Sequence, residues 1–298
     1  MKHPDTVQHS EEQVIKVNDI EIAYDTFGQP SDPAMLLIMG LGEQMIAWDE
    51  EFCARLAANG YWVIRFDNRD VGASTRFDEA GVPNLLALMR GEAVDVPYTL
   101  EDMAKDAIGL LEALAIEVAH VVGISMGGMI AQTIAINHPT RVRTLTSIMS
   151  TTGDPNLPSP KPEAAQLLYT PSPTERRAYI DHSVVVGHIL SGPGYPSSEE
   201  RRRELAGRVY DRGVNPSGLG RQLAAIFASG SRKAALKSIH IPTLVIHGDA
   251  DPLIPVEAGI DTAESIPGAK LMIIEGLGHG LPPEVWPQVM EAIASHAT

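Results

Sequence analysis

Ser125 stands in a Gly-x-Ser-x-Gly motif that runs from Gly123 to Gly127. A strand-like apolar run, 120–124, leads into the motif, and a helix-like run, 126–137, follows it. We therefore predict a tight turn between a strand and a helix, in which side chains two residues before and after the serine would collide. Such a turn raises the hydroxyl above the sheet edge, and the start of the helix favours developing negative charge. The pattern is typical of a nucleophilic serine; an ordinary glycine-rich turn is the alternative.

Candidates for the acid and the base that such a serine needs come later in the chain, in that order. Asp249 and Asp251 directly follow an apolar run, which predicts that they lie at the carboxyl end of a strand. His279 lies in a glycine-rich loop after the next such run. Open α/β sheets bind their ligands outside the carboxyl ends of their strands. We therefore expect one of these aspartates and His279 to lie at the same edge of the sheet as Ser125.

The elements that must position these residues follow from hydrophobic periodicity. Eight short apolar or alternating runs predict strands at 13–17, 20–25, 34–39, 62–66, 120–124, 144–149, 243–247 and 271–274. Helical patterns separate most of these runs, and one of them opens with a capping box, Thr99-x-x-Asp102. Strands that alternate with helices predict an α/β fold, a mostly parallel sheet with helices on both faces.

Residues 151–238 interrupt this alternation. Six prolines occur between positions 155 and 173, and helical stretches follow at 199–210 and 221–228. A structureless loop of this length would be unusual in a compact domain. We therefore expect a helical insertion over the end of the sheet, with residues 1–150 and 239–298 as the two parts of the core.

The chain resembles the α/β-hydrolase superfamily over nearly its whole length, and within it the bacterial carboxylesterase branch that includes aclacinomycin methylesterase. The segments that carry the resemblance are 39–42, 65–74, 123–128, 249–255 and 278–282. The resemblance implies an α/β-hydrolase fold with an eight-stranded, mostly parallel sheet. It also implies that 151–238 is the helical cap that this superfamily carries after its sixth strand.

The resemblance further implies the roles of individual residues. Ser125 is expected as the nucleophile, Asp251 as the acid and His279 as the base. The backbone amides of Met126 and Leu41 are expected to form the oxyanion hole. In one respect the chain departs from the superfamily, which often has His-Gly where this chain has Met39-Gly40. A methionine cannot donate the hydrogen bonds that a histidine would, so the loop must be held in another way.

Other residues compete for these roles. Asp249 is the alternative to Asp251, and the family spacing favours Asp251, which lies four residues before Pro255. Asp154 follows the sixth predicted strand, where some relatives place the acid. We expect His247 to be a packed strand residue and His138 a helix C-cap.

Charged residues also cluster at Asp67, Arg69 and Asp70, and we interpret them as loop-organising ion pairs beneath the site rather than as catalytic groups.

Composition limits the partners. The net charge of −15 argues against nucleic acid and anionic membranes. The single cysteine, Cys53, excludes an intramolecular disulfide and a cysteine-rich metal site, and we expect it in the core. The N-terminal residues show no secretory signal, so we expect a cytoplasmic location. The sequence leaves the oligomeric state open.

We therefore predict a serine ester hydrolase, a carboxylesterase acting on small to medium small-molecule esters without a metal or an organic cofactor. The alternatives are a cofactor-free haloperoxidase or perhydrolase, a carbon–carbon bond hydrolase of the same fold, and a ligand-sensing module that retains the triad. A dehalogenase is excluded because it needs a carboxylate at position 125.

Overall fold

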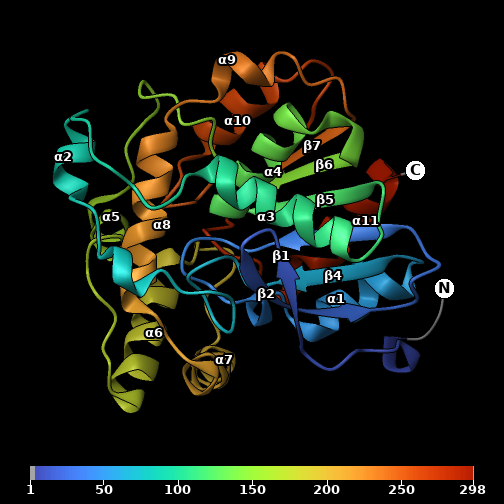
Figure 1. Ribbon diagram of the computed structural model, residues 1–298, viewed down its shortest axis with the longest axis horizontal. Helices are drawn as coiled ribbons and strands as arrows, with labels where there is room; N and C mark the ends of the chain where they lie inside the picture. Colours follow the sequence, from blue (N-terminus) through green and yellow to red (C-terminus); the bar gives the residue numbers. More distant parts are fainter. Residues whose placement is uncertain (1–3, 298) are drawn as a thin grey trace.

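The computed structural model describes residues 4–297; residues 1–3 and 298, at the outer ends of the two predicted core segments, lie outside it. Its centre is an eight-stranded sheet of order β1-β2-β4-β3-β5-β6-β7-β8 (Figure 1). β2 pairs antiparallel with β1 and β4, and all other pairs are parallel. The predicted α/β-hydrolase fold is therefore confirmed. The strands are β1 (Gln13–Val17), β2 (Ile20–Phe27), β3 (Ala34–Ile38), β4 (Trp62–Phe66), β5 (Ala119–Ile124), β6 (Val142–Ile148), β7 (Thr243–Gly248) and β8 (Lys270–Ile274).

Helices cover both faces of this sheet, as Figure 1 shows. They are α1 (Glu50–Ala58), α2 (Leu85–Met89), α3 (Leu100–Ala113), α4 (Met126–Asn137), α5 (Pro162–Leu167), α6 (Arg176–Leu190), α7 (Glu199–Arg212), α8 (Pro216–Ser229), α9 (Lys233–Leu236), α10 (Val256–Ser265) and α11 (Trp286–Ala297). The predicted capping box at Thr99 and Asp102 begins α3.

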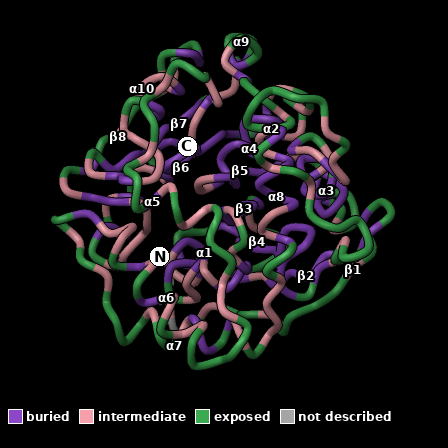
Figure 2. Tube along the Cα trace, turned by 90° about the vertical axis from the view of Figure 1, so that its left-hand side faces the viewer, coloured by how far each residue is buried: buried purple, intermediate pink, exposed green. Residues whose placement is uncertain are grey.

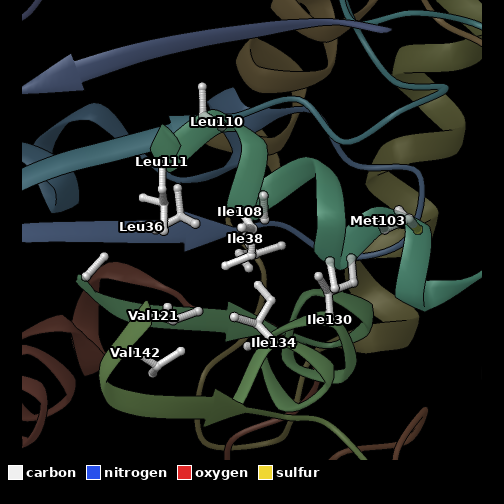
Figure 3. Close-up of a cluster of buried hydrophobic side chains, with 14 of the residues drawn as sticks. Leu36, Ile38, Met103, Ile108, Leu110, Leu111, Val121, Ile130, Ile134 and Val142 are labelled. Carbon is white, nitrogen blue, oxygen red and sulfur yellow. The ribbon is translucent and has the colours of Figure 1, made fainter. Parts of the chain in front are cut away.

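The alternation of side chains along β3 separates two hydrophobic layers. Leu36 and Ile38 pack in the layer formed with α3 and α4, which Figure 3 shows in close-up. Met35 and Leu37 pack in the opposite layer, formed with α1 and α11. Because both faces are covered, β3 reads in the sequence as one continuous apolar run.

Between β6 and β7 the chain forms helices α5 to α9. Helices α5 to α8 gather with α2 at one end of the molecule, on the left in Figure 1. Figure 2 faces that end, where exposed and partly exposed turns of these helices surround the buried central strands. The helical stretches expected at 199–210 and 221–228 lie within α7 and α8. The longest helix of this segment, α6, is not predicted from the sequence.

Within residues 4–297, no helix is both long enough and apolar enough to cross a membrane.

Candidate active site

Ser125 occupies a strained turn between β5 and α4. Its φ of 55° lies in the left-handed region, which non-glycine residues rarely adopt. A Cβ at Gly123 would overlap the carbonyl oxygen of Gly127, and a Cβ at Gly127 would overlap that of Ile38. Ser150 Oγ donates a hydrogen bond of 2.8 Å to Ser125 O and so fixes the turn from β6. The glycines of the motif are therefore required by close approach of backbone, as the sequence predicts.

His279 and Asp251 continue from this serine in one line of hydrogen bonds. His279 Nε2 lies 3.0 Å from Ser125 Oγ, and His279 Nδ1 lies 2.7 Å from Asp251 Oδ2. The other carboxylate oxygen, Oδ1, accepts the backbone N–H groups of Leu253 and Ile254, both at 2.8 Å. Three side chains far apart in the sequence thus meet at the carboxyl ends of β5, β7 and β8.

The Asp251 side chain is fully buried. Burial alone would raise its pKa, but the charge of His279, the hydrogen bond from its ring and the backbone N–H of Ile254 outweigh burial. The pKa of Asp251 therefore lies below its ordinary value, and the carboxylate stays ionised at neutral pH.

The competing acids have other partners. Asp249 is exposed, and its Oδ1 accepts the backbone N–H of Gly276 at 2.7 Å. Asp154 lies 2.7 Å from Lys233 Nζ, and this hydrogen bond lowers the pKa of Asp154 to about 2. Lys233 is in turn 2.5 Å from Asp261. Asp154 therefore links two elements of the fold instead of reaching His279.

His247 lies behind the acid. Its Nε2 donates to Ile254 O at 2.8 Å and is 3.6 Å from Asp251 Oδ2. Its Nδ1 has no hydrogen-bond partner among the described residues. Burial lowers the pKa of His247, so the ring is neutral when it supports the 251–254 turn. His138 is the C-cap residue of α4, as expected.

The two predicted oxyanion-hole donors, the backbone N–H groups of Met126 and Leu41, belong to segments next to Ser125. Met126 is the first residue of α4, where N–H groups lack intrahelical acceptors. Gly40 approaches the serine so closely that a Cβ there would lie 3.2 Å from Ser125 Cβ. The next residue, Leu41, has a backbone N–H that finds no acceptor in the part of the chain that the structure describes.

The charged cluster that follows β4 fixes helices α7 and α8 to the core. Arg212 of α7 is 2.8 Å from Asp67, and Arg221 of α8 makes two hydrogen bonds of 2.8 Å to Asp70. Arg69 instead turns inward and pairs with Asp106 of α3 at 2.6 Å. These residues form loop-organising ion pairs, as predicted. Two of their partners, Arg212 and Arg221, lie in the 151–238 segment, and the sequence does not predict these long-range pairs.

A second attachment involves backbone alone. The N–H of His279 donates to the carbonyl oxygen of Leu190, at the end of α6, at 2.7 Å. Close by, a Cβ on Gly192 would overlap Gly276 O, and a Cβ on Gly278 would overlap Gly192 N. The loop that carries His279 is therefore held directly by the segment between β6 and β7.

Neither a metal site nor a reactive thiol accompanies this arrangement in residues 4–297. No group of three or more His, Cys, Asp or Glu side chains is placed there to hold a metal ion. Cys53 is fully buried on α1, and burial raises the pKa of its thiol to about 12. It is a core residue, as expected.

Comparison with known proteins agrees with the fold. The family model described as alpha/beta hydrolase fold matches residues 33–284. The chain is 32% identical to rhodomycin D methylesterase DauP of Streptomyces sp. (strain C5), over 95% of this chain and 97% of that protein. It is 31% identical to the 2-hydroxymuconate semialdehyde hydrolase of Pseudomonas sp. (strain CF600), over 70% of this chain and 71% of that one.

Solved structures are similar at lower identity. The esterase EaEST from Exiguobacterium antarcticum superposes with a TM-score of 0.76 at 21% identity, covering 96% of this chain and 99% of that one. A meta-cleavage product hydrolase from Pseudomonas fluorescens IP01 also gives 0.76, at 20% identity, covering 95% and 96%. At these identities the likeness concerns the fold alone.

Proposed function

The chain belongs to the alpha/beta hydrolase fold family and is a carboxylic ester hydrolase, and we propose that Ser125 is its nucleophile, His279 its general base and Asp251 the acid that orients the base. The observation that carries this proposal is the unbroken line from Ser125 Oγ through His279 to Asp251, with contacts of 3.0 and 2.7 Å. These distances lie within the range that proton transfer requires.

In the first half of the reaction, Ser125 Oγ attacks the ester carbonyl carbon while its proton moves to His279 Nε2. Asp251 accepts a hydrogen bond from Nδ1–H, holds that tautomer and stabilises the imidazolium. The tetrahedral intermediate then collapses, the carbon–oxygen bond to the alcohol breaks, and His279 returns the proton to the departing alcohol. An acyl-enzyme ester on Ser125 remains.

In the second half, water replaces the alcohol. His279 takes a proton from the water as it attacks the acyl carbon, and the new tetrahedral intermediate releases the carboxylic acid. The proton on His279 returns to Ser125 Oγ. Every step uses side chains of this protein and water.

The negative oxygen of both intermediates needs donors that are already in place. We assign this role to the N–H groups of Met126 and Leu41. The N-terminus of α4 adds the positive end of its helix dipole at the same point. Removing one such donor typically costs about 10²–10³ in kcat.

Residues 151–238 are proposed as the cap that bounds the acyl pocket. The attachments of α6, α7 and α8 around the site support this role. The similarity to rhodomycin D methylesterases favours a methyl ester, with methanol as the leaving alcohol.

The test is hydrolysis of p-nitrophenyl esters from C2 to C12, and of methyl esters of the same acids, by the wild type and Ser125→Ala. We expect kcat to fall on the order of 10⁶-fold in Ser125→Ala with an unchanged circular dichroism spectrum. Ser265→Ala, a buried serine at the end of α10, is the matched control and should keep wild-type activity. Retention of most activity by Ser125→Ala would refute the assignment.

A second candidate is hydrolysis of a carbon–carbon bond, which the similarity to 2-hydroxymuconate semialdehyde hydrolase favours. Turnover of that semialdehyde with no turnover of any ester would select it over the esterase proposal.

A further inference from the structure

We propose that Asn68 and Gln222 are the positioning residues of the oxyanion loop, residues 39–42. Asn68 acts from the core and Gln222 from α8 of the cap, so the cap takes part in catalysis as well as bounding the pocket. This inference rests on the proposed function, because it assigns how the Leu41 donor is held.

The loop has little freedom on the side that faces the nucleophile. A Cβ on Gly40 would approach Ser125 Cβ to 3.2 Å, and a Cβ on Gly127 would lie 2.8 Å from Met39 O. The loop therefore packs directly against the serine turn. Any shift of the loop changes the distance between its N–H groups and the reacting carbon.

Three of the loop's backbone groups are already bonded. Met39 O accepts from Asn68 Nδ2 at 3.0 Å, and Gly40 O accepts from the N–H of Glu43 at 3.4 Å. Gly42 N–H donates to Gln222 Oε1 at 2.8 Å. The Leu41 N–H lies between the bonded Gly40 O and Gly42 N–H, and it finds no acceptor in the described part of the chain. The loop is thus held at both ends around the Leu41 N–H.

Gln222 is suited to hold one end. Its side chain is fully buried, and its amide nitrogen donates to Arg69 O at 2.8 Å, so both ends of the carboxamide are fixed. Leu219, one turn earlier on α8, fills the space beside Gly42, where a Cβ would meet Leu219 Cδ1 at 2.6 Å. The neighbouring Arg221 locks α8 onto Asp70.

Asn68 holds the other end at an evident cost. It is 1% exposed, and its Oδ1 has no hydrogen-bond partner among the described residues. A buried polar atom without a partner destabilises a protein, and an alanine here would avoid that cost. What the asparagine side chain provides in return is the hydrogen bond that its Nδ2 donates to Met39 O. This bond and the bond that Gly42 N–H donates to Gln222 Oε1 hold the loop, which the Met39 side chain cannot do.

The experiment compares Gln222→Met and Asn68→Ala with the wild type and Ser125→Ala. Gln222→Met keeps the size of the side chain and removes its polar ends. Two quantities are measured for each variant: the steady-state kinetics on p-nitrophenyl acetate and the inhibition constant of phenylboronic acid. The tetrahedral adduct that phenylboronic acid forms with a serine carries negative charge, as the oxyanion does. Tyr98→Phe is the matched control, since it removes a buried hydrogen bond of 2.6 Å to Asp70 and leaves residues 39–42 untouched.

Mispositioning a donor weakens the transition state more than the ground state. We therefore expect each variant to lower kcat by about 10- to 100-fold, with KM changed by less than about threefold. The inhibition constant of phenylboronic acid should rise by a similar factor. Tyr98→Phe should stay within about twofold of the wild type in both quantities, although it loses a buried hydrogen bond as well.

Wild-type kcat and boronic acid affinity in folded Gln222→Met and Asn68→Ala would overturn the proposal while Ser125→Ala remained inactive. If one variant does not fold, the other decides the outcome alone. If Ser125→Ala keeps its activity, the proposed function fails and this inference fails with it. A loss of thermal stability with unchanged kinetics would mean a purely structural role and would also overturn it.

Discussion

Asp251 uses its two oxygens for different tasks. Oδ1 is bonded to two backbone N–H groups of its own turn, and Oδ2 faces His279, with His247 on its far side. The carboxylate can therefore rotate little, and the imidazole it orients is fixed in turn. The position of the carboxylate is set by the backbone of Leu253 and Ile254, within three residues of Asp251, and by His247 of β7.

Asp251→Asn is expected to lower kcat by on the order of 10⁴, because an amide cannot hold the imidazole in the tautomer that accepts the serine proton. Asp249→Asn and Asp154→Asn serve as matched controls, since each loses a carboxylate that bonds elsewhere. Steady-state kinetics on p-nitrophenyl acetate would measure all three. A larger loss in either control than in Asp251→Asn would reassign the acid.

The residues that could be named from the sequence are those with a local signature. Ser125, Asp251 and His279 each stand in a glycine-rich or strand-end motif, and the structure brings them within hydrogen-bond distance. Asn68 and Gln222 have no such signature. Gln222 is one polar residue in a helical run, and nothing in that run indicates its role. Its hydrogen-bond partner Gly42 lies 180 positions away in the sequence. Contacts between distant segments are invisible to periodicity.

At the scale of elements, the 151–238 segment, which we propose as the cap, is attached differently on the two sides of the site. On the side of α7 and α8, one partly buried and one fully buried arginine–aspartate pair bind the loop after β4. On the side of α6, backbone packs against backbone without any charge. The first attachment depends on charged side chains and the second on the absence of side chains.

Gly192→Ala is expected to lower kcat at least about 10-fold and stability by about 1–3 kcal/mol, because the new Cβ would overlap Gly276 O, a backbone atom that cannot rotate away. Gly280→Ala is the control in the same region: it is adjacent to His279, yet a Cβ there meets nothing within 4 Å. Kinetics and thermal melts would compare the two. Equal behaviour of both variants would show that the glycine contact does not position the base.

Asp70→Asn is expected to destabilise the protein by up to about 3–5 kcal/mol, because the fully buried Arg221 loses its buried bidentate carboxylate and keeps only the exposed Asp78, at 2.9 Å, as a counter-ion. Asp211→Asn removes an equally bidentate partner from Arg176, but that pair is exposed on the surface of the cap. Solvent screens such a pair, so this control should change stability little. Urea unfolding would measure both; a small loss in Asp70→Asn would mean that solvent reaches Arg221.

The helices of the cap were the elements that the sequence predicted least completely. α6 buries only Val184 and Gly187 and carries polar residues around much of its circumference, so it shows no strong apolar stripe. α3, by contrast, buries nine of its residues and begins with a capping box, and it was predicted. A helix that buries few of its residues leaves little trace in hydrophobic periodicity.

For the whole molecule, the sheet was predictable because its inner strands are buried on both faces. β3 reads as an unbroken apolar run, and β4 and β7 read as mainly apolar runs. The alternation of these runs with helices then specifies a parallel sheet. How the 151–238 segment seats on that sheet was not predictable, because it depends on pairs such as Arg212 with Asp67, separated by 145 positions.

Three buried histidines should make the whole fold sensitive to moderate acid. Burial lowers the pKa of His120 to about 4, and it also lowers the pKa values of His247 and His296. As pH falls below about 6.5, the unfolded chain takes up protons at these rings while the folded protein does not. Stability is therefore complete above about pH 6.5 and is lost toward the folded-state pKa values, at up to about 1.4 kcal/mol per pH unit for each ring.

The check is urea unfolding from pH 7.5 to 4.5 for the wild type and His120→Asn. Asparagine keeps a polar group where His120 Nδ1 meets Thr144 Oγ1 at 2.8 Å. The variant should lose stability less steeply with falling pH, by up to about 1.4 kcal/mol per unit. Parallel curves would show that His120 is not the group that takes up the proton.

The order of the attachments along the chain has a consequence for biosynthesis. Asp67 and Asp70, which pair with α7 and α8, are synthesised before residues 151–238. His279, which bonds to Leu190, is synthesised after them. Gln222 and His279 are 57 residues apart, about 3–11 s of synthesis at ~5–20 residues per second. During that interval a nascent chain can place α7 and α8 beside Ser125 before His279, its proposed base, has been made. We expect ester cleavage to appear only when β8, the His279 loop and α11 have joined the sheet, so activity would report the assembly of this last part of the fold.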